Sequence, residues 1–364
     1  MNAALPSLDL NITVQDMRKI WGQASTGQTR PGQINLTPLH ARLVELFERW
    51  LGMDRIDRQE DLEALGSLLF QILFDGPLFG LYEELRRQAG PGQRLRLQLG
   101  FQEAAFEIAG YPWEFLYVPE TETRRGYFMA TEASIVLSRY MPLDAERLAD
   151  LKPVMGPLTI LVVVSSPGDL HPVIAPPVIE ALTNLAQDHG ARLIVEKAPT
   201  ADRFLQVLRD NQPQVLHFLG HGQFNAARQR GEVALLADDG AHALWVPDRL
   251  FADYFQQMDT VPRLVFLHSC QGGANQFQAR FAGLAPQLVR ANIQAVIAMQ
   301  YPINNGPAIQ FAKAFYRELA GGAPVDSAAQ AGRLAITSDP NYAHANRVFG
   351  TPMLWMRSRS GVIL

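Results

Sequence analysis

From residue 158 onwards, short apolar runs alternate with segments in which apolar residues recur every three or four positions. Runs of this length are typical of buried strands, and the intervening periodicity is typical of helices. The strand-like runs are LTILVVV, ARLIVE, VLHFLG, RLVFLH and AVIAMQ, and the helical patterns lie near VIEALTNLAQD, ADRFLQVLRD and AGLAPQLVRAN. Continuous apolar strands separated by helices predict a mostly parallel sheet covered on both faces, which is a three-layer α/β sandwich.

The first 140 residues have a more mixed pattern. Two amphipathic helical patterns, TPLHARLVELFERWL and LEALGSLLFQILF, accompany the strand-like stretches RLRLQLGF, AAFEIA and ASIVLSRY. Residues 142–157, PLDAERLADLKPVMGP, then bring three prolines and a glycine with little apolar periodicity. We therefore predict a smaller mixed α+β lobe over residues 1–150, followed by the main α/β domain over residues 151–364.

Composition and charge narrow the class of protein. Hydrophobic residues make up 48% of the 364 residues and charged residues 19%, so the chain can bury a substantial core. A net charge of -4 provides no basic footprint for nucleic acid or anionic lipid, so we expect neither nucleic acid nor a membrane as a partner. The N-terminus lacks a basic start followed by an apolar stretch, and no apolar run approaches about 20 residues. We expect a soluble cytoplasmic protein.

Cys270 is the only cysteine of the chain. A single cysteine cannot form an internal disulfide or supply a Cys-rich zinc site. The phosphate-binding G-x-x-x-x-G-K-[ST], the serine elbow G-x-S-x-G and the zinc-binding H-E-x-x-H are all missing from the sequence. We therefore expect neither a metal nor a cofactor, and the role of the lone thiol becomes the main question.

Two of the predicted strands end in residues that carry chemistry. The run VLHFLG leads to His221, which lies between Gly220 and Gly222, and the run RLVFLH leads to Ser269 and Cys270. Ligands and reacting groups gather outside the carboxyl ends of strands in open α/β sheets. If the two strands are neighbours, an imidazole and a thiol share one edge of the sheet.

That arrangement suits acyl transfer. A free thiol has a pKa of about 8.5, so a nearby base must activate it at neutral pH. His221 would take the proton of Cys270 and later protonate the leaving amine. The backbone amides of Gly222 and Cys270 would form the oxyanion hole, in which each donor stabilises the transition state by about 3 kcal/mol.

These residues carry a resemblance to a known family. Cys270 follows His221 by 49 residues, close to the caspase-type spacing of about 50. The stretches VLHFLGHG, AVIAMQYPI, FAKAFYRELAGGAPVDSAAQAGRLAI and FGTPMLWM resemble a CHAT domain, the caspase-like peptidase domain that is related to separase. The earlier stretches RLRLQLGF and YPWEFLY resemble the lobe that precedes the catalytic fold in many CHAT proteins, so the resemblance covers roughly residues 65–357.

The resemblance implies a cysteine endopeptidase that cleaves a protein partner, in bacterial defence or regulated cell death. CHAT domains are often attached to tetratricopeptide repeats, but this chain has no internal repeat of 20 to 50 residues. We therefore expect an activating sensor or repeat protein on a separate chain. Two alternatives stay open: a catalytically silent caspase-like scaffold that binds a protein partner through the same cleft, and a nucleotide-binding flavodoxin-like module.

Further positions are candidates for substrate binding. In metacaspases the residue two positions before the nucleophile is acidic and in caspases it is Gln, whereas here it is His268. The hairpin GEVALLADDGAHALWVP would border the cleft, although its DDG turn is also explained by hairpin geometry alone. The candidate substrate-binding residues are His268, Ser269, Gln300, Tyr301, Asp238 and Asp239.

Three other polar residues receive a structural interpretation. We expect His217, inside its apolar strand, to be a core histidine. Glu114 lies among aromatic residues, and we expect it to be a buried acid paired with Arg139. Metal ligation by His268 and Cys270 would provide too few ligands.

Overall fold

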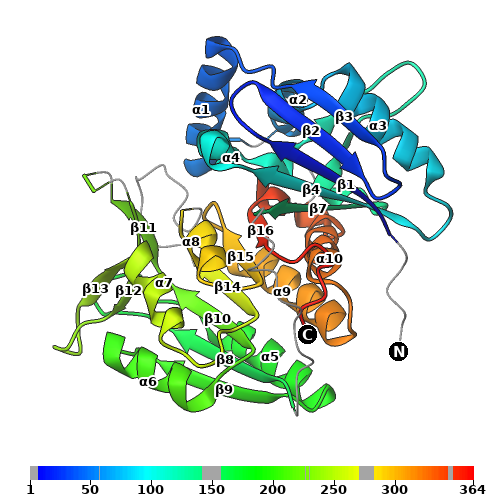
Figure 1. Cartoon of the computed structure of the whole chain (residues 1–364). Helices are drawn as coiled ribbons and strands as arrows, with labels where there is room; N and C mark the ends of the chain where they lie inside the picture. Colours follow the sequence, from blue (N-terminus) through cyan, green and yellow to red (C-terminus); the bar gives the residue numbers. More distant parts are fainter. Residues whose placement is uncertain are drawn as a thin grey trace.

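A sheet of 11 strands runs through both halves of the chain (Figure 1). The computed structural model describes residues 7–56, 58–141, 157–225, 227–228, 230–269, 283–342 and 347–364. In order across the sheet, the strands are β3 (Thr29–Gln33), β2 (Lys19–Ala24), β1 (Ser7–Val14), β4 (Arg94–Phe101), β7 (Ile135–Tyr140), β16 (Pro352–Met356), β15 (Ala295–Met299), β14 (Leu264–Ser269), β10 (Val215–Gly220), β8 (Thr159–Val164) and β9 (Arg192–Lys197). Neighbours pair in parallel except at β3–β2, β2–β1 and β16–β15. The prediction of a mostly parallel sheet is confirmed.

Helices cover both faces of the C-terminal half of this sheet. One layer holds α5 (Pro176–Asp188), α9 (Asn305–Ala320) and α10 (Val325–Thr337), and the other holds α6 (Ala201–Asn211), α7 (Asp248–Gln256) and α8 (Leu284–Arg290) (Figure 1). Phe266 of β14 packs against Phe311 and Phe315 of α9. Phe218 of β10 packs on the other side, against Phe251 of α7. The three-layer sandwich predicted from the alternating pattern is therefore confirmed.

The N-terminal half adds its own strands and the longer helices α1 (Pro38–Gly52), α2 (Gln59–Leu73) and α3 (Gly76–Gln88). Both amphipathic patterns in this half form the predicted helices, α1 and α2. Residues 104–109, AAFEIA, form no strand, so that prediction is wrong. They form a 3₁₀ turn, Glu103–Ala105, followed by the short helix α4, Phe106–Ala109. Ala105, Ile108 and Ala109 are the buried members, and this spacing places them on one face of a helix.

The two halves meet where β7 lies beside β16, in a short parallel ladder that pairs Arg139 with Trp355. Arg333 of α10 is fully buried there and donates hydrogen bonds to the carbonyl of Leu137 on β7 (3.0 Å) and to that of Pro352 on β16 (2.9 Å). The boundary expected at 142–157 lies almost entirely outside the described residues, so the division into two domains stays a prediction. The sheet itself is continuous across it.

Smaller sheets complete the fold. The structure describes a three-stranded sheet of β11 (Gly222–Asn225), β12 (Arg230–Leu236) and β13 (Ala243–Pro247), and a two-stranded one of β5 (Tyr117–Val118) and β6 (Tyr127–Phe128). The antiparallel pairing of β12 with β13 confirms the predicted hairpin. In Figure 1 the three-stranded sheet extends from the layer that holds α7.

No single helix in the described ranges is long and apolar enough to cross a membrane. The consecutive helices α2 and α3 reach that length and composition only together, across a bend of 107°.

Replacement of Arg333 by Met is expected to lower the free energy of unfolding by about 3 kcal/mol, because buried carbonyl groups of both strands lose charge-assisted hydrogen bonds. Urea-induced unfolding followed by tryptophan fluorescence measures this change. Arg317→Met on the exposed surface of α9 is the matched control, with an expected change below about 0.5 kcal/mol. Equal stability of the two variants would contradict this role of Arg333.

Candidate active site

The candidate site lies at the carboxyl ends of β10 and β14. The two strands are neighbours, as predicted, and pair in parallel from Val215 beside Leu264 to Gly220 beside Ser269. His221 is the next residue after Gly220, and Cys270 is the next residue after Ser269. Cys270 lies outside the described residues, as does the stretch 271–282. Gly220 pairs with Ser269, so His221 directly follows the residue that lies beside Ser269.

His221 lies at the junction between two sheets. Its side chain is only 4% exposed, and its carbonyl accepts a hydrogen bond from the amide of Ala234 on β12 (3.0 Å). Gly222, which was predicted to contribute to the oxyanion hole, starts β11 directly afterwards, opposite Val233. The chain thus leaves the main sheet at His221, and the next residue already pairs within the three-stranded sheet of β11, β12 and β13.

Ser165, which follows β8, fastens this junction from the other side. Its hydroxyl donates to the carbonyl of Ala234 (2.7 Å), and its amide donates to the carbonyl of Leu219 (2.8 Å). A Cβ atom on Gly220 would lie 3.2 Å from the Cβ of Ser165 and 2.5 Å from the ring of Phe218. Glycine at position 220 is therefore required by close packing next to His221.

A buried acid, Glu232, stabilises the strands that follow His221. Its carboxylate accepts hydrogen bonds from the side-chain amides of Gln223 (2.8 Å) and Asn225 (3.1 Å) on β11. Arg230 and Arg228 place guanidinium nitrogens 3.5 and 3.7 Å from the same oxygen, which offsets the cost of burying the charge. Sequence reasoning did not identify Glu232. The alternation of polar residues along QFN and RGE was the signal that could have revealed this cross-strand cluster.

Two histidines lie side by side beneath this edge. His217 is fully buried, as predicted for a core histidine; its Nδ1 is hydrogen-bonded to the hydroxyl of Tyr316 (2.9 Å), and its ring stacks on Phe266 at 4.4 Å. His268 is 1% exposed, with its ring 5.7 Å from that of His217. Neither ring nitrogen of His268 has a hydrogen-bond partner among the residues that the structure describes. This interior position gives no support to the expected role of His268 in substrate binding.

Gln300, another predicted substrate-binding residue, belongs to a buried polar cluster. The predicted pairing of Glu114 with Arg139 is confirmed: the guanidinium donates from Nε (3.0 Å) and again from Nη2. The side-chain amide of Gln300 donates to the same carboxylate (2.9 Å) and to the carbonyl of Gly350 (2.6 Å). Gln300 follows β15 directly, so the cluster supports the end of this strand, which lies next to β14. The side-chain amide of Gln300 makes its hydrogen bonds inside the protein.

Two further predicted positions, Tyr301 and Asp239, have contacts of their own in the structure. Tyr301 follows Gln300 and is buried among Phe115 and Arg347. The Asp239 carboxylate accepts hydrogen bonds from the amides of Ala241 (2.9 Å) and His242 (3.0 Å), which lower the pKa of Asp239 to about 2. These contacts support the turn interpretation for the DDG stretch.

Asp238 is exposed beside Asp239 at the same turn. Ser269 ends β14, and its backbone lies beside that of Gly220. Substrate contacts of these two residues stay predictions. Across the described ranges, no group of three or more His, Cys, Asp or Glu side chains could hold a metal ion.

A hollow of about 450 Å³ lies beside the strands that follow His221. Arg230 and Gly231 of β12 form one wall, and Gly283 and Gln287 at α8 form another. Phe106 of α4 completes the lining on the side of the N-terminal half. The hollow therefore joins residues of both halves next to β12.

Replacement of Glu114 by Gln is expected to lower the free energy of unfolding by about 3 kcal/mol or more, because Arg139 keeps its buried charge without a counter-charge. Chemical unfolding of Glu114→Gln, Arg139→Met and the double variant measures the coupling. The double variant should lose less stability than the two single variants added together. Exposed Glu318→Gln is the control, and a Glu114→Gln protein as stable as this control would contradict the assignment.

The buried histidines predict a pH dependence of stability. Burial lowers the pKa of His268 from 6.5 to about 4 and lowers that of His217 in the same direction. Below its ordinary pKa the unfolded chain binds a proton at His268 that the folded chain does not bind. The free energy of unfolding should therefore fall as the pH is lowered from about 6.5 to about 4, by about 3 kcal/mol for His268 alone.

Unfolding curves recorded across this pH window measure the effect. His268→Phe keeps an aromatic ring but removes the titrating group, so part of the pH dependence should disappear. His171→Phe, at an exposed position, is the matched control. The same pH dependence in wild type and His268→Phe would show that His268 does not titrate in this way.

A family model and several solved structures are similar to this chain. The model of the CHAT domain family matches residues 63–361. Two crystal structures of the separase–securin complex of Saccharomyces cerevisiae align with 13% and 12% identity and TM-scores of 0.41 and 0.39. The alignments cover 86% and 92% of this chain but only 20% and 21% of those chains.

The Drosophila initiator caspase Dronc aligns with 12% identity and a TM-score of 0.31, over 45% of this chain and 64% of that chain. A comparison with curated proteins gives no match. The family match spans most of the sequence, including β10, β14 and the strands on either side of them. The chain therefore belongs to the CHAT domain family.

Proposed function

We propose that this protein is a cysteine endopeptidase that cleaves a protein partner. The observation that carries the proposal is the parallel register of Gly220 with Ser269, because His221 and Cys270 are the residues that follow these two in the sequence. Membership of the CHAT family supports a caspase-like peptidase fold, and no metal or cofactor is needed for this chemistry.

In the proposed mechanism, Cys270 attacks the carbonyl carbon of the scissile bond. His221 accepts the thiol proton and then donates it to the nitrogen of the leaving amine, so that the peptide bond breaks and an acyl-enzyme remains. A water molecule, deprotonated by His221, then releases the acyl group and restores the thiol. The amides of Gly222 and Cys270 would stabilise the negative charge on the carbonyl oxygen in both steps.

The surroundings of His221 suit this role. Proton transfer requires a positioned base, and an error of about 1 Å can reduce the rate about 100-fold. The contacts of Ser165, Ala234 and the Glu232 cluster hold the backbone on both sides of His221. We propose that residues flanking the cut occupy the hollow between β12 and α8.

On family grounds we further propose a role in bacterial defence or regulated cell death, with activation by a sensor or repeat protein on a separate chain. Substrate contacts of Asp238 and Ser269 are part of this proposal. The two strands that precede the proposed dyad, β10 and β14, pair with each other and with β8 and β15 in the main sheet.

An acyloxymethyl ketone probe, which alkylates activated thiols, is expected to label Cys270. His221→Gln should lower the labelling rate about 100-fold or more, because the thiol loses its base. Intact-protein mass spectrometry measures the rate at one site only, since the chain has a single cysteine. The matched control is His242→Gln, an exposed histidine on the β12–β13 turn, which should be labelled like wild type.

Peptide libraries and candidate partner proteins, incubated with wild type and Cys270→Ala, complete this test. Cleavage should occur with wild type alone. Equal cleavage by both proteins would remove the nucleophile assignment. Labelling that is slow and independent of His221 would instead favour the catalytically silent scaffold.

A further inference from the structure

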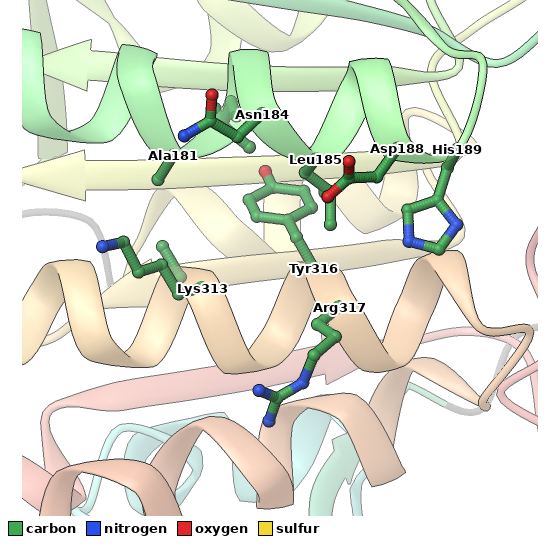
Figure 2. Close-up of a pocket in the computed structure, with 10 residues that line it drawn as sticks. Ala181, Asn184, Leu185, Asp188, His189, Lys313, Tyr316 and Arg317 are labelled. Atoms are coloured by element: carbon green, nitrogen blue, oxygen red, sulfur yellow. The ribbon is translucent and has the colours of Figure 1, made fainter.

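A second cavity lies behind the sheet, between α5 and α9, and has a volume of about 370 Å³. Figure 2 shows Tyr316 between the two helices, with Ala181 on α5 and Lys313 on α9 near one end of the space. Ala181 and Ala312 line it, and these small side chains leave the helices incompletely packed against each other. Volumes of about 300 to 1,000 Å³ with a mostly apolar lining are typical of sites for small molecules.

The polar groups around this cavity favour an anion. Lys313 and Arg317 come from α9, whereas Asp188 is the acidic residue of the lining. In the described part of the chain Lys313 has no ion pair or hydrogen bond, and Arg317 is 71% exposed with Glu318 at 4.0 Å. Two cations with little internal pairing outnumber one acid, so a ligand with an apolar body and one anionic group matches the lining.

The floor of the cavity is connected to the candidate active site. Tyr316 is buried, and its hydroxyl is hydrogen-bonded to His217 of β10, four residues before His221. The ring of His217 lies 5.7 Å from that of His268 on β14, two residues before Cys270. Both strands that end in the proposed dyad are therefore within two contacts of Tyr316.

We propose that this cavity is a regulatory site for a small organic anion with an apolar body, and that its ligand acts on β10 and β14 through Tyr316 and His217. A ligand that packs against the Tyr316 ring displaces the hydroxyl from His217. The Nε2 of His217 has no partner among the described residues, so the hydrogen bond at Nδ1 is the one polar contact that this ring has there. Its loss in the interior favours a shift of the adjacent strand ends.

The binding half of this proposal is independent of the proposed function, whereas the regulatory half rests on Cys270 as the nucleophile. Two fluorescent probes test the binding half: anilinonaphthalene sulfonate, which is an apolar anion, and N-phenylnaphthylamine, which has a similar apolar body without the charge. Wild type should bind the anion at least tenfold more tightly than the neutral probe.

Two variants locate the bound probe. Lys313→Met keeps the apolar stem but removes the charge, so the affinity for the anionic probe should fall about tenfold while that for the neutral probe stays unchanged. Ala181→Trp fills the space and should abolish binding of both. Lys19→Met, at an exposed position on β2, is the matched control and should bind like wild type. Equal affinity of wild type, Lys313→Met and Ala181→Trp for the anionic probe would overturn the site.

Alkylation of the lone thiol by iodoacetamide tests the regulatory half without any peptidase substrate. Saturation with the anionic probe should change the alkylation rate of Cys270 at least threefold in wild type. Tyr316→Phe keeps the ring but removes the hydroxyl, so it should bind the probe normally and show no such change. A rate unaffected by bound probe in wild type would overturn the regulatory half, whatever the cleavage assays show.

Discussion

The in-register pairing of β10 with β14 is the constraint on which the candidate site depends. Each residue of a strand advances the chain by about 3.3 Å and turns the side chain to the opposite face, so a slip of one position would separate His221 from the end of β14 and reverse its direction. The register is held because both strands are buried on both faces, by α9 on one side and α7 on the other. The position of the candidate site thus follows from the packing of two apolar runs.

Buried polar groups add a second level of specification around this edge. Glu114 with Arg139 and Gln300 supports the end of β15, and Glu232 supports the strands after His221. A buried charge is tolerated only where its partners are in place, so each cluster penalises other arrangements of the same backbone. Apolar packing therefore determines the strand pairing of the sheet. The polar clusters determine the path of the chain after the strands end.

Much of the C-terminal architecture could be predicted because its strands are continuous apolar runs, such as the ones that end at Gly220 and Ser269. The hairpin and the Glu114–Arg139 pair were also visible, since a DDG turn and a lone acid among aromatic residues have few structural solutions. The strands β1 to β3 and the helix α3 were missed. β1 aligns in parallel over eight residue pairs with β4, which is distant in sequence, and β3 is the stretch TRPGQ, which has no apolar run. Gln300 resembled a site residue because its position at a strand end is visible locally, while its partners Glu114 and Gly350 are not.

The direction of the strands explains how the N-terminal half can contribute to the site. β16 runs antiparallel to β15 but parallel to β7, and β7 runs parallel to β4, so the carboxyl ends of β4 and β7 lie at the edge opposite to those of β10, β14 and β15. Residues at the carboxyl ends of β4 and β7 therefore do not lie beside His221. Glu114, in the 3₁₀ helix Trp113–Phe115, reaches the edge of His221 through its hydrogen bond with Gln300, and Phe106 lines the hollow beside β12. The contribution of the N-terminal half is support and shape, whereas both residues of the proposed dyad belong to the C-terminal half.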